Sequence, residues 1–233
     1  MKAKALVLDC GGVMVYPPTG DWTLTADMLS VLGADFLDAH LDAYRAARKT
    51  AERFIPDSHR MEDELTEGAM LECLYRRTFA AMGRPLSDED YAFLVKCQLS
   101  NNRYGVFDDV KPFLARWQGK IALGALSDAS PSTRRILREE GVSQHLDALT
   151  FSFELGACKP DARMYLCALE KAGVAPEDAV FVDDMIRNLR GAQAVGMRAV
   201  QMLRPMPARY AMDAPWDGPV AHDFAELGAL LEL

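Results

Sequence analysis

The sequence predicts an α/β protein built on a doubly wound parallel sheet, with an all-helical domain inserted after the first strand. Three observations lead to this expectation. Short, continuous apolar runs recur along the chain, and such runs are typical of strands that are covered on both faces. Segments with helical periodicity separate these runs in the second half, which indicates strand–helix alternation with right-handed crossovers. Between the first run and residue 105, by contrast, no strand-like run appears.

The predicted strands are short, and polar residues follow them. The first covers residues 5–8, Ala-Leu-Val-Leu, and is followed directly by Asp9. Later runs share this apolar character, although one of them is weaker than the rest. These further strands are expected at 121–126, 179–182 and 198–202, with the weaker candidate at 147–151.

The helices between these strands have recognisable ends. Ser130 is a typical N-cap because a proline follows it at the first helical position, and Gly141 marks the end of that helix. A second helix is expected to begin at Pro160 and to end before Gly173. A third is expected over about 186–195.

The helical insertion has its own internal signals. Ser87 and Asp90 resemble a capping box, and a break is expected around 55–58, Ile-Pro-Asp-Ser. The stretches with helical period are 23–54, 62–82 and 87–99. The expected domains are therefore a core, 1–16 and 105–233, and a helical domain, 17–104.

Composition limits the partners and the compartment. Half of the 233 residues are hydrophobic, 26% are charged, and the formal net charge is −8, as in an ordinary globular protein of acidic character. Such a chain binds nucleic acid and anionic membranes poorly, but it can accept a small phosphorylated substrate where a metal ion reverses the local field. No apolar stretch approaches about 20 residues, and the five scattered cysteines form no CxxC pair. We therefore expect a cytoplasmic monomer or homodimer without a membrane span, disulfide frame or zinc site.

Reactive side chains gather where the predicted strands end. In chain order they are Asp9, Ser127, Asp128, Lys159, Asp183 and Asp184. In doubly wound sheets, ligands bind beyond the carboxyl ends of the strands, so these side chains are expected to converge on one edge. Three carboxylates that close together cannot all remain ionised without a cation. A Mg²⁺ ion held by carboxylates, waters and a substrate phosphate meets this need.

These residues, in this order, resemble four motifs of the haloacid dehalogenase superfamily. Asp9-Cys10-Gly11-Gly12-Val13 resembles the first motif, in the Asp-x-Gly-x-Val form of its phosphatase branch. Ser127 stands where the family has a hydroxyl residue, and Cys158-Lys159-Pro160-Asp161 matches the segment of its lysine. The run 181–188, Phe-Val-Asp-Asp-Met-Ile-Arg-Asn, resembles the acidic metal motif. The resemblance extends along nearly the whole chain and implies that the helical insertion is the cap domain of the family.

The resemblance also implies a mechanism, that of a magnesium-dependent phosphohydrolase. Asp9 would attack phosphorus and form an aspartyl-phosphate, which water then hydrolyses. The Asp9 carboxylate, the Gly11 carbonyl and Asp184 would hold Mg²⁺, with Asp183 acting through a coordinated water. Asn188, one helical turn after Asp184, would support the waters of the metal.

The phosphoryl group would be contacted by residues of the second and third motifs. The resemblance implies that Ser127 donates a hydrogen bond to it and that Lys159 neutralises its charge. Asp128 is a further candidate for this contact, but asparagine is commoner there and a carboxylate near phosphate is unfavourable unless it is protonated or turned away. A role at the helix N-terminus is the simpler interpretation of Asp128.

Position 11 departs from the family pattern. Most phosphatases of the family carry a second aspartate there, which protonates the leaving group, and such assistance is worth about 10²–10⁴-fold. Sugar-phosphate phosphatases that resemble this chain have glycine, and a good leaving group needs less protonation. Three functions therefore stay open: a phosphatase of a small metabolite such as a sugar phosphate, a metal-independent dehalogenase, and a silent binding protein.

Each candidate residue also has an ordinary structural interpretation. Asp9 before two glycines is a common turn residue, and Asp183 or Asp184 is a plausible N-cap for the next helix. Trp22 and Tyr16 are candidates for stacking on a substrate or for packing in the core.

Overall fold

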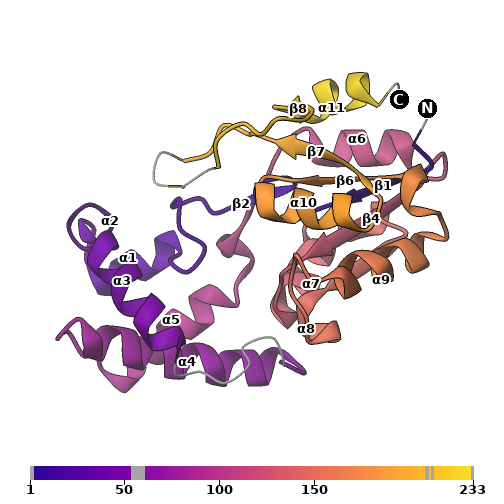
Figure 1. The fold of residues 1–233 in the computed structure, drawn as a ribbon. Helices are drawn as coiled ribbons and strands as arrows, with labels where there is room; N and C mark the ends of the chain where they lie inside the picture. Colours follow the sequence, from indigo (N-terminus) through magenta and orange to yellow (C-terminus); the bar gives the residue numbers. More distant parts are fainter. Residues whose placement is uncertain (1–2, 54–60, 208–209, 211–212, 232–233) are drawn as a thin grey trace.

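A six-stranded parallel sheet forms one layer of the molecule, and its strand order is β5-β4-β1-β6-β7-β8 (Figure 1). The computed structural model describes residues 3–53, 61–207, 210 and 213–231, so the break expected at 55–58 lies outside the described residues. The strands are β1 (Ala5–Leu8), β4 (Ala122–Ser127), β5 (Ala148–Phe151), β6 (Ala179–Asp183), β7 (Arg198–Met202) and β8 (Val220–Ala221). The doubly wound sheet and the first five of these strands were predicted; the two-residue β8 is too short to carry a pattern.

The central strand β1 is buried on both faces. Leu6 and Leu8 point to one hydrophobic cluster, whereas Ala5 and Val7 point to another, because successive side chains in a strand alternate between faces. Because side chains on both faces are buried, every position of the strand is apolar, which gives the continuous apolar run in the sequence.

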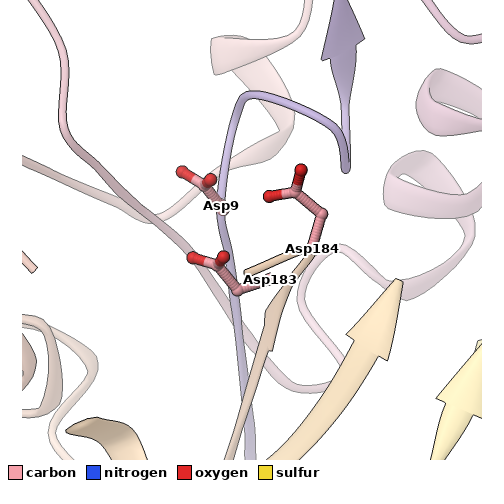
Figure 2. Close-up of side chains that lie close together, drawn as sticks. All are labelled: Asp9, Asp183 and Asp184. Atoms are coloured by element: carbon pink, nitrogen blue, oxygen red, sulfur yellow. The ribbon is translucent and has the colours of Figure 1, made fainter. Parts of the chain in front are cut away.

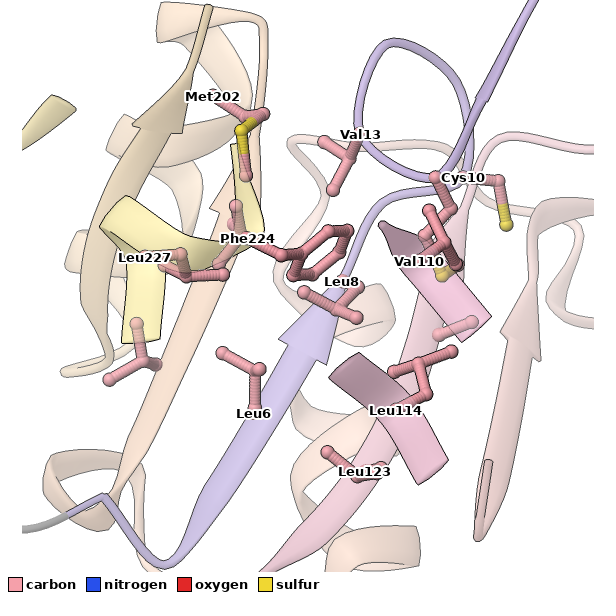
Figure 3. Packing of buried hydrophobic residues seen from close by; sticks show 14 of the residues in the cluster. Leu6, Leu8, Cys10, Val13, Val110, Leu114, Leu123, Met202, Phe224 and Leu227 are labelled. Carbon is pink, nitrogen blue, oxygen red and sulfur yellow. The ribbon is translucent and has the colours of Figure 1, made fainter. Parts of the chain in front are cut away.

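Helices cover both faces of the sheet. On the Leu6 and Leu8 face lie α6 (Val110–Trp117), α7 (Pro131–Glu139) and α11 (Phe224–Leu230), and Figure 3 shows how α6 and α11 pack against β1. On the other face lie α9 (Ala162–Ala172) and α10 (Ile186–Ala194). Three shorter helical elements lie in the connections between these strands and helices: η3 (Ser143–His145), α8 (Ser152–Leu155) and η4 (Pro176–Asp178).

Strand β1 lies where the chain changes direction across the sheet. It pairs with β4 on one side and with β6 on the other, so the crossovers to the two neighbours run in opposite directions. A crevice forms at the carboxyl end of such a strand, and ligands bind there in open α/β sheets. The fold therefore positions the end of β1, and Asp9 directly after it, as the focus of a site.

A second, helical body follows β1 in the chain (Figure 1). Its elements are η1 (Ala26–Met28), α1 (Leu29–Leu32), α2 (Phe36–Ala39), α3 (Leu41–Glu52), α4 (Glu64–Ala81), α5 (Asp88–Gln98) and η2 (Asn101–Arg103). It has a hydrophobic cluster of its own, which includes Phe36, Tyr44 and Phe79. The stretch 23–54, expected to be helical, is divided into short helices, and Gly33, which adopts φ 105°, ends the first of the α-helices.

The two segments that join this body to the sheet layer lie side by side. Strand β2 (Val15–Tyr16) pairs antiparallel with β3 (Gly105–Val106). A Cβ atom on Gly105 would lie only 2.3 Å from the ring of Tyr16, so glycine is required for this close approach. The pairing falls at the boundaries expected from the sequence, 16/17 and 104/105.

The helix ends agree with the sequence only in part. The capping box of Ser87 and Asp90 is confirmed. Helix α9 begins at Ala162 rather than at Pro160, because the Asp161 side chain accepts the backbone N–H of residue 163 and acts as the N-cap. Ser130 is the N-cap residue of α7, as expected, but its hydroxyl donates to Glu67 Oε1 at 2.6 Å and accepts no backbone N–H of the helix. In the described part of the chain, the helices are too short or too polar to cross a membrane.

Candidate functional site

Three carboxylates meet at the carboxyl ends of β1 and β6. Figure 2 shows Asp9, Asp183 and Asp184 pointing into one space, and one oxygen of each lies within 4.8 Å of the others. Asp9 directly follows β1, Asp183 is the last residue of β6, and Asp184 follows it. The convergence that the sequence predicts for these three side chains is thus present.

Lys159 links two of these carboxylates. Its Nζ atom lies 2.8 Å from Asp9 Oδ1 and 2.7 Å from Asp183 Oδ2, and the lysine is only 4% exposed. Burial acts to lower the pKa of Lys159, but Asp183, Asp9 and Asp128 outweigh it and raise that pKa above the ordinary lysine value. The ammonium group therefore keeps its charge and acts as the fixed cation of the cluster.

The two oxygens of Asp9 differ in their surroundings. Oδ1 forms the ion pair with Lys159 and accepts a hydrogen bond from the N–H of Cys10 at 2.7 Å. No hydrogen bond from a described residue reaches Oδ2. One oxygen is therefore anchored while the other stays available to a ligand.

Asp183 is fully buried and is surrounded by donors. Its carboxylate accepts hydrogen bonds from Lys159 Nζ, from the N–H of Met185 at 2.8 Å, and from Asn188 Nδ2 at 3.0 Å to each oxygen. Burial raises the pKa of Asp183, as do Asp9 and Asp184, whereas Lys159 opposes the shift. Asn188 is 2% exposed, and its two hydrogen bonds orient Asp183.

Asp184 faces a residue that the sequence did not reveal. Its Oδ2 accepts a hydrogen bond from the Tyr210 hydroxyl at 2.7 Å, and it does not cap α10, whose N-cap is Met185. Burial, followed by the charge of Asp9, raises the pKa of Asp184, and the Tyr210 hydrogen bond lowers it. A Cβ on Gly12 would lie 2.6 Å from Asp184 Oδ2, so this glycine makes room for the carboxylate.

The sequence favours a role for Asp128 at a helix N-terminus, but its carboxylate bonds to the backbone of Lys159 instead. Its Oδ1 accepts the backbone N–H of Lys159 at 2.9 Å, and the N-cap of α7 is Ser130. Asp128 therefore braces the loop that carries Lys159. Burial raises the pKa of Asp128, and Lys159 acts in the opposite direction.

These groups open into a cavity of about 240 Å³. Sequence-predicted residues that line it are Asp9, Gly11, Ser127, Asp128, Lys159, Asp184, Asn188 and Trp22. Asp183 is not among them, and Tyr16 packs instead against Phe107 and Gly105. Lining residues that were not singled out are Arg103, Tyr104, Thr133, Arg187 and Tyr210.

The missed residues had weak signals in the sequence. Arg187 belongs to the quoted acidic motif and could have been found there. Arg103 and Tyr104 are the last residues of the helical insertion, where the chain must return toward the sheet edge. Tyr210 lies in a segment rich in proline and without periodicity, and only the fold brings it to Asp184.

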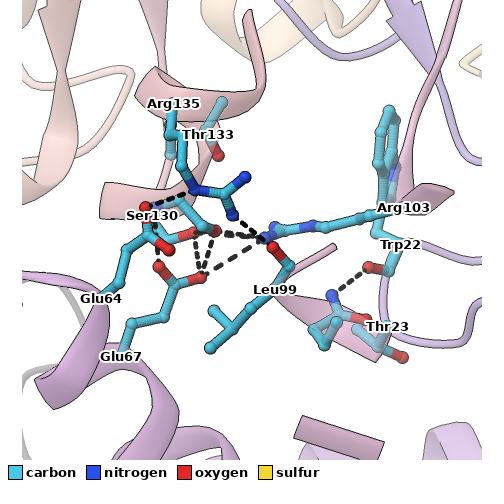
Figure 4. Close-up of polar contacts among 12 residues, drawn as sticks. Trp22, Thr23, Glu64, Glu67, Leu99, Arg103, Ser130, Thr133 and Arg135 are labelled. Atoms are coloured by element: carbon cyan, nitrogen blue, oxygen red, sulfur yellow. Dashed lines mark hydrogen bonds and ion pairs between the residues drawn. The ribbon is translucent and has the colours of Figure 1, made fainter. Parts of the chain in front are cut away.

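A polar network joins the helical body to the sheet layer beside this cavity (Figure 4). Glu67 of α4 accepts hydrogen bonds from the hydroxyl groups of Ser130 and Ser132 at 2.6 and 2.7 Å, and from the N–H of Ser132 at 2.8 Å. Arg103 Nη1 lies 3.4 Å from the same carboxylate and donates to Ser132 Oγ at 3.0 Å. Arg135 of α7 pairs with Glu64 at 2.8 Å. These contacts hold α4 against the start of α7.

The donor set fits a divalent cation. Asp9, Asp183 and Asp184 bring three carboxylates together, and Lys159 supplies a single positive charge, so full ionisation leaves two negative charges uncompensated. Oxygen ligands of this kind suit hard divalent cations. Burial and the charge of Asp9 raise the pKa of Asp184, and a bound cation would favour its ionised form.

Comparisons with known proteins point to one family. Residues 3–196 match the model of the haloacid dehalogenase-like hydrolases. The chain is 37% identical over 109 residues to a phosphoserine phosphatase of Thermus thermophilus, covering 44% of each protein. It is 34% identical over 112 residues to an enolase-phosphatase E1 of Sorangium cellulosum, covering 47% of this chain and 48% of that protein. The matches thus span about half the length of these curated relatives.

The fold has close counterparts among solved structures. The L-2-haloacid dehalogenase of Xanthobacter autotrophicus superposes with a TM-score of 0.71, at 18% identity, over 99% of this chain and 98% of that one. At this identity the likeness extends to the fold alone.

Proposed function

Because this chain belongs to the haloacid dehalogenase-like hydrolases, we propose that it hydrolyses phosphate monoesters of small metabolites, with Asp9 as the nucleophile and Mg²⁺ as the cofactor. One observation carries the proposal: Asp9 is held by Lys159 at 2.8 Å beside two further carboxylates, in a cavity at the end of β1. The similarity to proteins named phosphatases supports the choice of a phosphate ester.

Asp9 is suited to attack phosphorus because one of its oxygens is free. Lys159 and the Cys10 N–H fix Oδ1, which leaves Oδ2 to form the bond. An in-line approach by Oδ2 gives an aspartyl-phosphate, and water then attacks phosphorus to restore the carboxylate. Because the carboxylate is already oriented, little conformational freedom is lost when the substrate binds.

The proposed ligands of Mg²⁺ are Asp9, the Gly11 carbonyl and Asp184. When bound, the ion supplies positive charge that lets an anionic nucleophile approach an anionic phosphate. Asp183 is the proposed water-mediated member, since hydrogen bonds from Lys159, Asn188 and Met185 already occupy its oxygens. Asn188 then acts by orienting Asp183.

Ser127 and Lys159 are the proposed phosphoryl contacts. Ser127 ends β4 and lines the cavity, so its hydroxyl is able to donate to a phosphoryl oxygen. The Lys159 ammonium offsets charge that accumulates in the transition state. The contact predicted for Asp128 stays a prediction, and the hydrogen bond from the Lys159 N–H supports a bracing role instead.

Residues 17–104 are the proposed cap domain. The paired strands β2 and β3 form a narrow connection to the core, and Trp22, Arg103 and Tyr104 reach the cavity from this side. Closure of such a lid excludes water from the reacting groups and selects the substrate.

A phosphate-release assay with a panel of phosphorylated metabolites tests the proposal. Release is expected with Mg²⁺, is expected to stop in EDTA, and is expected to fall by roughly 10⁴-fold or more in Asp9→Asn, which loses the covalent nucleophile. Asp178→Asn is the matched control, because this aspartate pairs with Lys4 far from the cavity. Release that Asp9→Asn leaves intact contradicts the proposal.

The same protein samples decide between the alternatives. Halide release from 2-haloacids that persists in EDTA would favour a metal-independent dehalogenase. Stabilisation by phosphorylated ligands, without turnover of any of them, would favour a silent binding protein.

A further inference from the structure

Gly11 and Trp22 share one space in the cavity. Gly11 follows Asp9 by two residues, and both line the pocket. A Cβ atom on Gly11 would lie 3.1 Å from Cζ2 and 3.2 Å from Cη2 of Trp22. Carbon atoms that are not bonded pack at about 3.5–4.0 Å, so any side chain at position 11 would have to displace the indole ring.

Trp22 is held in this place from several sides. Its carbonyl oxygen accepts a hydrogen bond from Gln98 Nε2 at 2.8 Å, and Gln98 is itself buried. Its ring makes edge-on contacts with Tyr104 and Tyr210, with centroids 5.7 and 5.9 Å away. These rings come from three separate segments and form what we call the aromatic wall: Trp22, Tyr104 and Tyr210.

The polar groups near the wall are already engaged. The Tyr210 hydroxyl donates to Asp184, and the Tyr104 hydroxyl shares a hydrogen bond of 3.2 Å with Thr133 Oγ1. Of the carboxylates that line the cavity in the described part of the chain, Asp9 forms an ion pair with Lys159 through Oδ1, and Asp128 accepts the Lys159 N–H through Oδ1. The wall thus presents ring surface to a ligand at the place where a side chain on residue 11 would otherwise lie.

We propose that the Gly11–Trp22 arrangement selects phosphate monoesters whose leaving group is flat, aromatic and able to depart without a proton, namely aryl phosphates. The inference rests on the proposed function and adds the substrate class. Aromatic rings in contact gain about 0.5–1.5 kcal/mol beyond the burial of their area, so the wall favours an aryl group over an alkyl group of similar size.

The chemistry of the leaving group also favours aryl phosphates. Asp9 Oδ2 bonds to phosphorus while the bond from phosphorus to the ester oxygen breaks, and that oxygen leaves with the electron pair. A phenol ionises near a pKa of about 10, as tyrosine does, so a phenolate can leave unprotonated and take its proton from solvent. An aliphatic alkoxide is far more basic, like hydroxide, and leaves poorly unless it receives a proton. Water then hydrolyses the aspartyl-phosphate, and the products are the phenol, inorganic phosphate and the restored Asp9 carboxylate.

A series of leaving groups tests the proposal by turnover. Phosphate release from 4-nitrophenyl, phenyl and glycerol phosphate is expected to fall in this order, with kcat/KM at least about 10²-fold lower for glycerol phosphate than for the nitrophenyl ester, the lower end of the usual contribution of an acid catalyst. Equal rates for aryl and alkyl esters, with both abolished in Asp9→Asn, overturn this inference and leave the proposed function standing. Rates that Asp9→Asn does not change overturn the proposed function instead.

Binding tests the aromatic wall without turnover. Titration calorimetry with phenylphosphonate and methylphosphonate is expected to show roughly 5–10-fold tighter binding of the phenyl compound. Trp22→Leu is expected to remove this preference, whereas Trp117→Phe, a tryptophan on α6 outside the cavity, is expected to keep it. Equal affinity of the native protein for the two phosphonates overturns the proposal whatever the variants do.

A pair of substitutions tests the shared space. Gly11→Asp alone is expected to lower activity, because the new side chain collides with Trp22. Gly11→Asp combined with Trp22→Gly is expected to raise the rate on glycerol phosphate relative to Trp22→Gly alone, since a carboxyl group then has room beside the ester. Faster hydrolysis of glycerol phosphate by Gly11→Asp in the presence of Trp22 contradicts the argument.

Discussion

The molecule buries carboxylates in two places, and the two are stabilised in different ways. At the end of β1, Asp9, Asp183 and Asp184 share the single ammonium group of Lys159. Between α4 and α7, Glu67 is 2% exposed and accepts three hydrogen bonds from the start of α7, with Arg103 nearby.

The difference separates a binding site from a structural contact. The Glu67 carboxylate has its partners within the protein, including a backbone N–H at the positive end of a helix. The cluster around Asp9 lacks positive charge, and it opens to a cavity from which a cation and a phosphate can reach it. Burial alone therefore does not identify a functional carboxylate; a shortage of partners does.

The largest loss of stability is expected when the positive charge of Lys159 is removed from the Asp9 cluster. Lys159→Met leaves three carboxylates without it, and breaking a buried ion pair from one side costs about 3–5 kcal/mol of unfolding free energy. Urea unfolding in EDTA measures the change. Lys49→Met, on the exposed face of α3, is the control and is expected to have little effect. An unchanged stability of Lys159→Met shows that the cluster does not depend on this charge.

A smaller loss of stability is expected when the Glu67 contact is removed. Glu67→Ala leaves the donors of Ser130 and Ser132 without their acceptor, which is expected to cost about 2–4 kcal/mol of unfolding free energy. The partly exposed pair of Glu64 with Arg135 is the comparison, and Glu64→Ala is expected to cost at most about 1 kcal/mol. Equal losses in the two variants contradict the structural role assigned to Glu67.

Metal binding should distinguish the two places directly. Mg²⁺ at about 100 times its Kd is expected to stabilise the protein by about 2.7 kcal/mol through mass action. Asp184→Asn is expected to lose most of this gain, whereas Glu67→Gln is expected to keep it, and thermal unfolding with and without EDTA measures both. A gain that Asp184→Asn retains places the ion elsewhere.

The smallest effect concerns pH and the thiol beside Asp9. Burial, with the charge of Asp9 second, raises the pKa of Cys10 to about 12, whereas an unfolded cysteine ionises near pKa 8.5. The folded state favours the protonated thiol. Its contribution to the free energy of unfolding is therefore complete below pH 8.5 and is lost as the pH rises toward 12. Between pH 8 and 10 the native protein is expected to lose about 1–2 kcal/mol more stability than Cys10→Ala.

Urea unfolding at pH 8, 9 and 10 in EDTA measures this slope. Cys73→Ala, on the exposed side of α4, is the control and should follow the native protein. Parallel slopes for the native protein and Cys10→Ala contradict the shift.

Most of the fold could be predicted because local patterns and burial agree. The strands β1, β4 and β6 are apolar throughout, and parallel strands covered on both faces require this. The elements that were missed, such as α11 and β8, are short and lie beyond the clear alternation. The stretch with helical period at 23–54 forms several short helices, one of which ends at Gly33.

The candidate site could be predicted less completely. Asp9, Ser127, Lys159 and Asp184 were placed together because they follow the strands whose carboxyl ends share one edge. The N-cap role considered for Asp184 was wrong, because Met185 is the N-cap of α10. Asp184 and Asp128 make their hydrogen bonds instead with the Tyr210 hydroxyl and the Lys159 N–H, which come from distant segments.

The sequence by itself determined the strand–helix order, the acidic edge of the sheet and the absence of a side chain at Gly11, because these depend on residue type and on short-range spacing. Only the tertiary structure decided that Trp22 lies against Gly11, that Tyr210 meets Asp184, and that Glu67 rather than a cap binds Ser130. Such contacts join residues far apart in the chain, and they follow from how the helical body packs on the sheet layer, which periodicity does not encode.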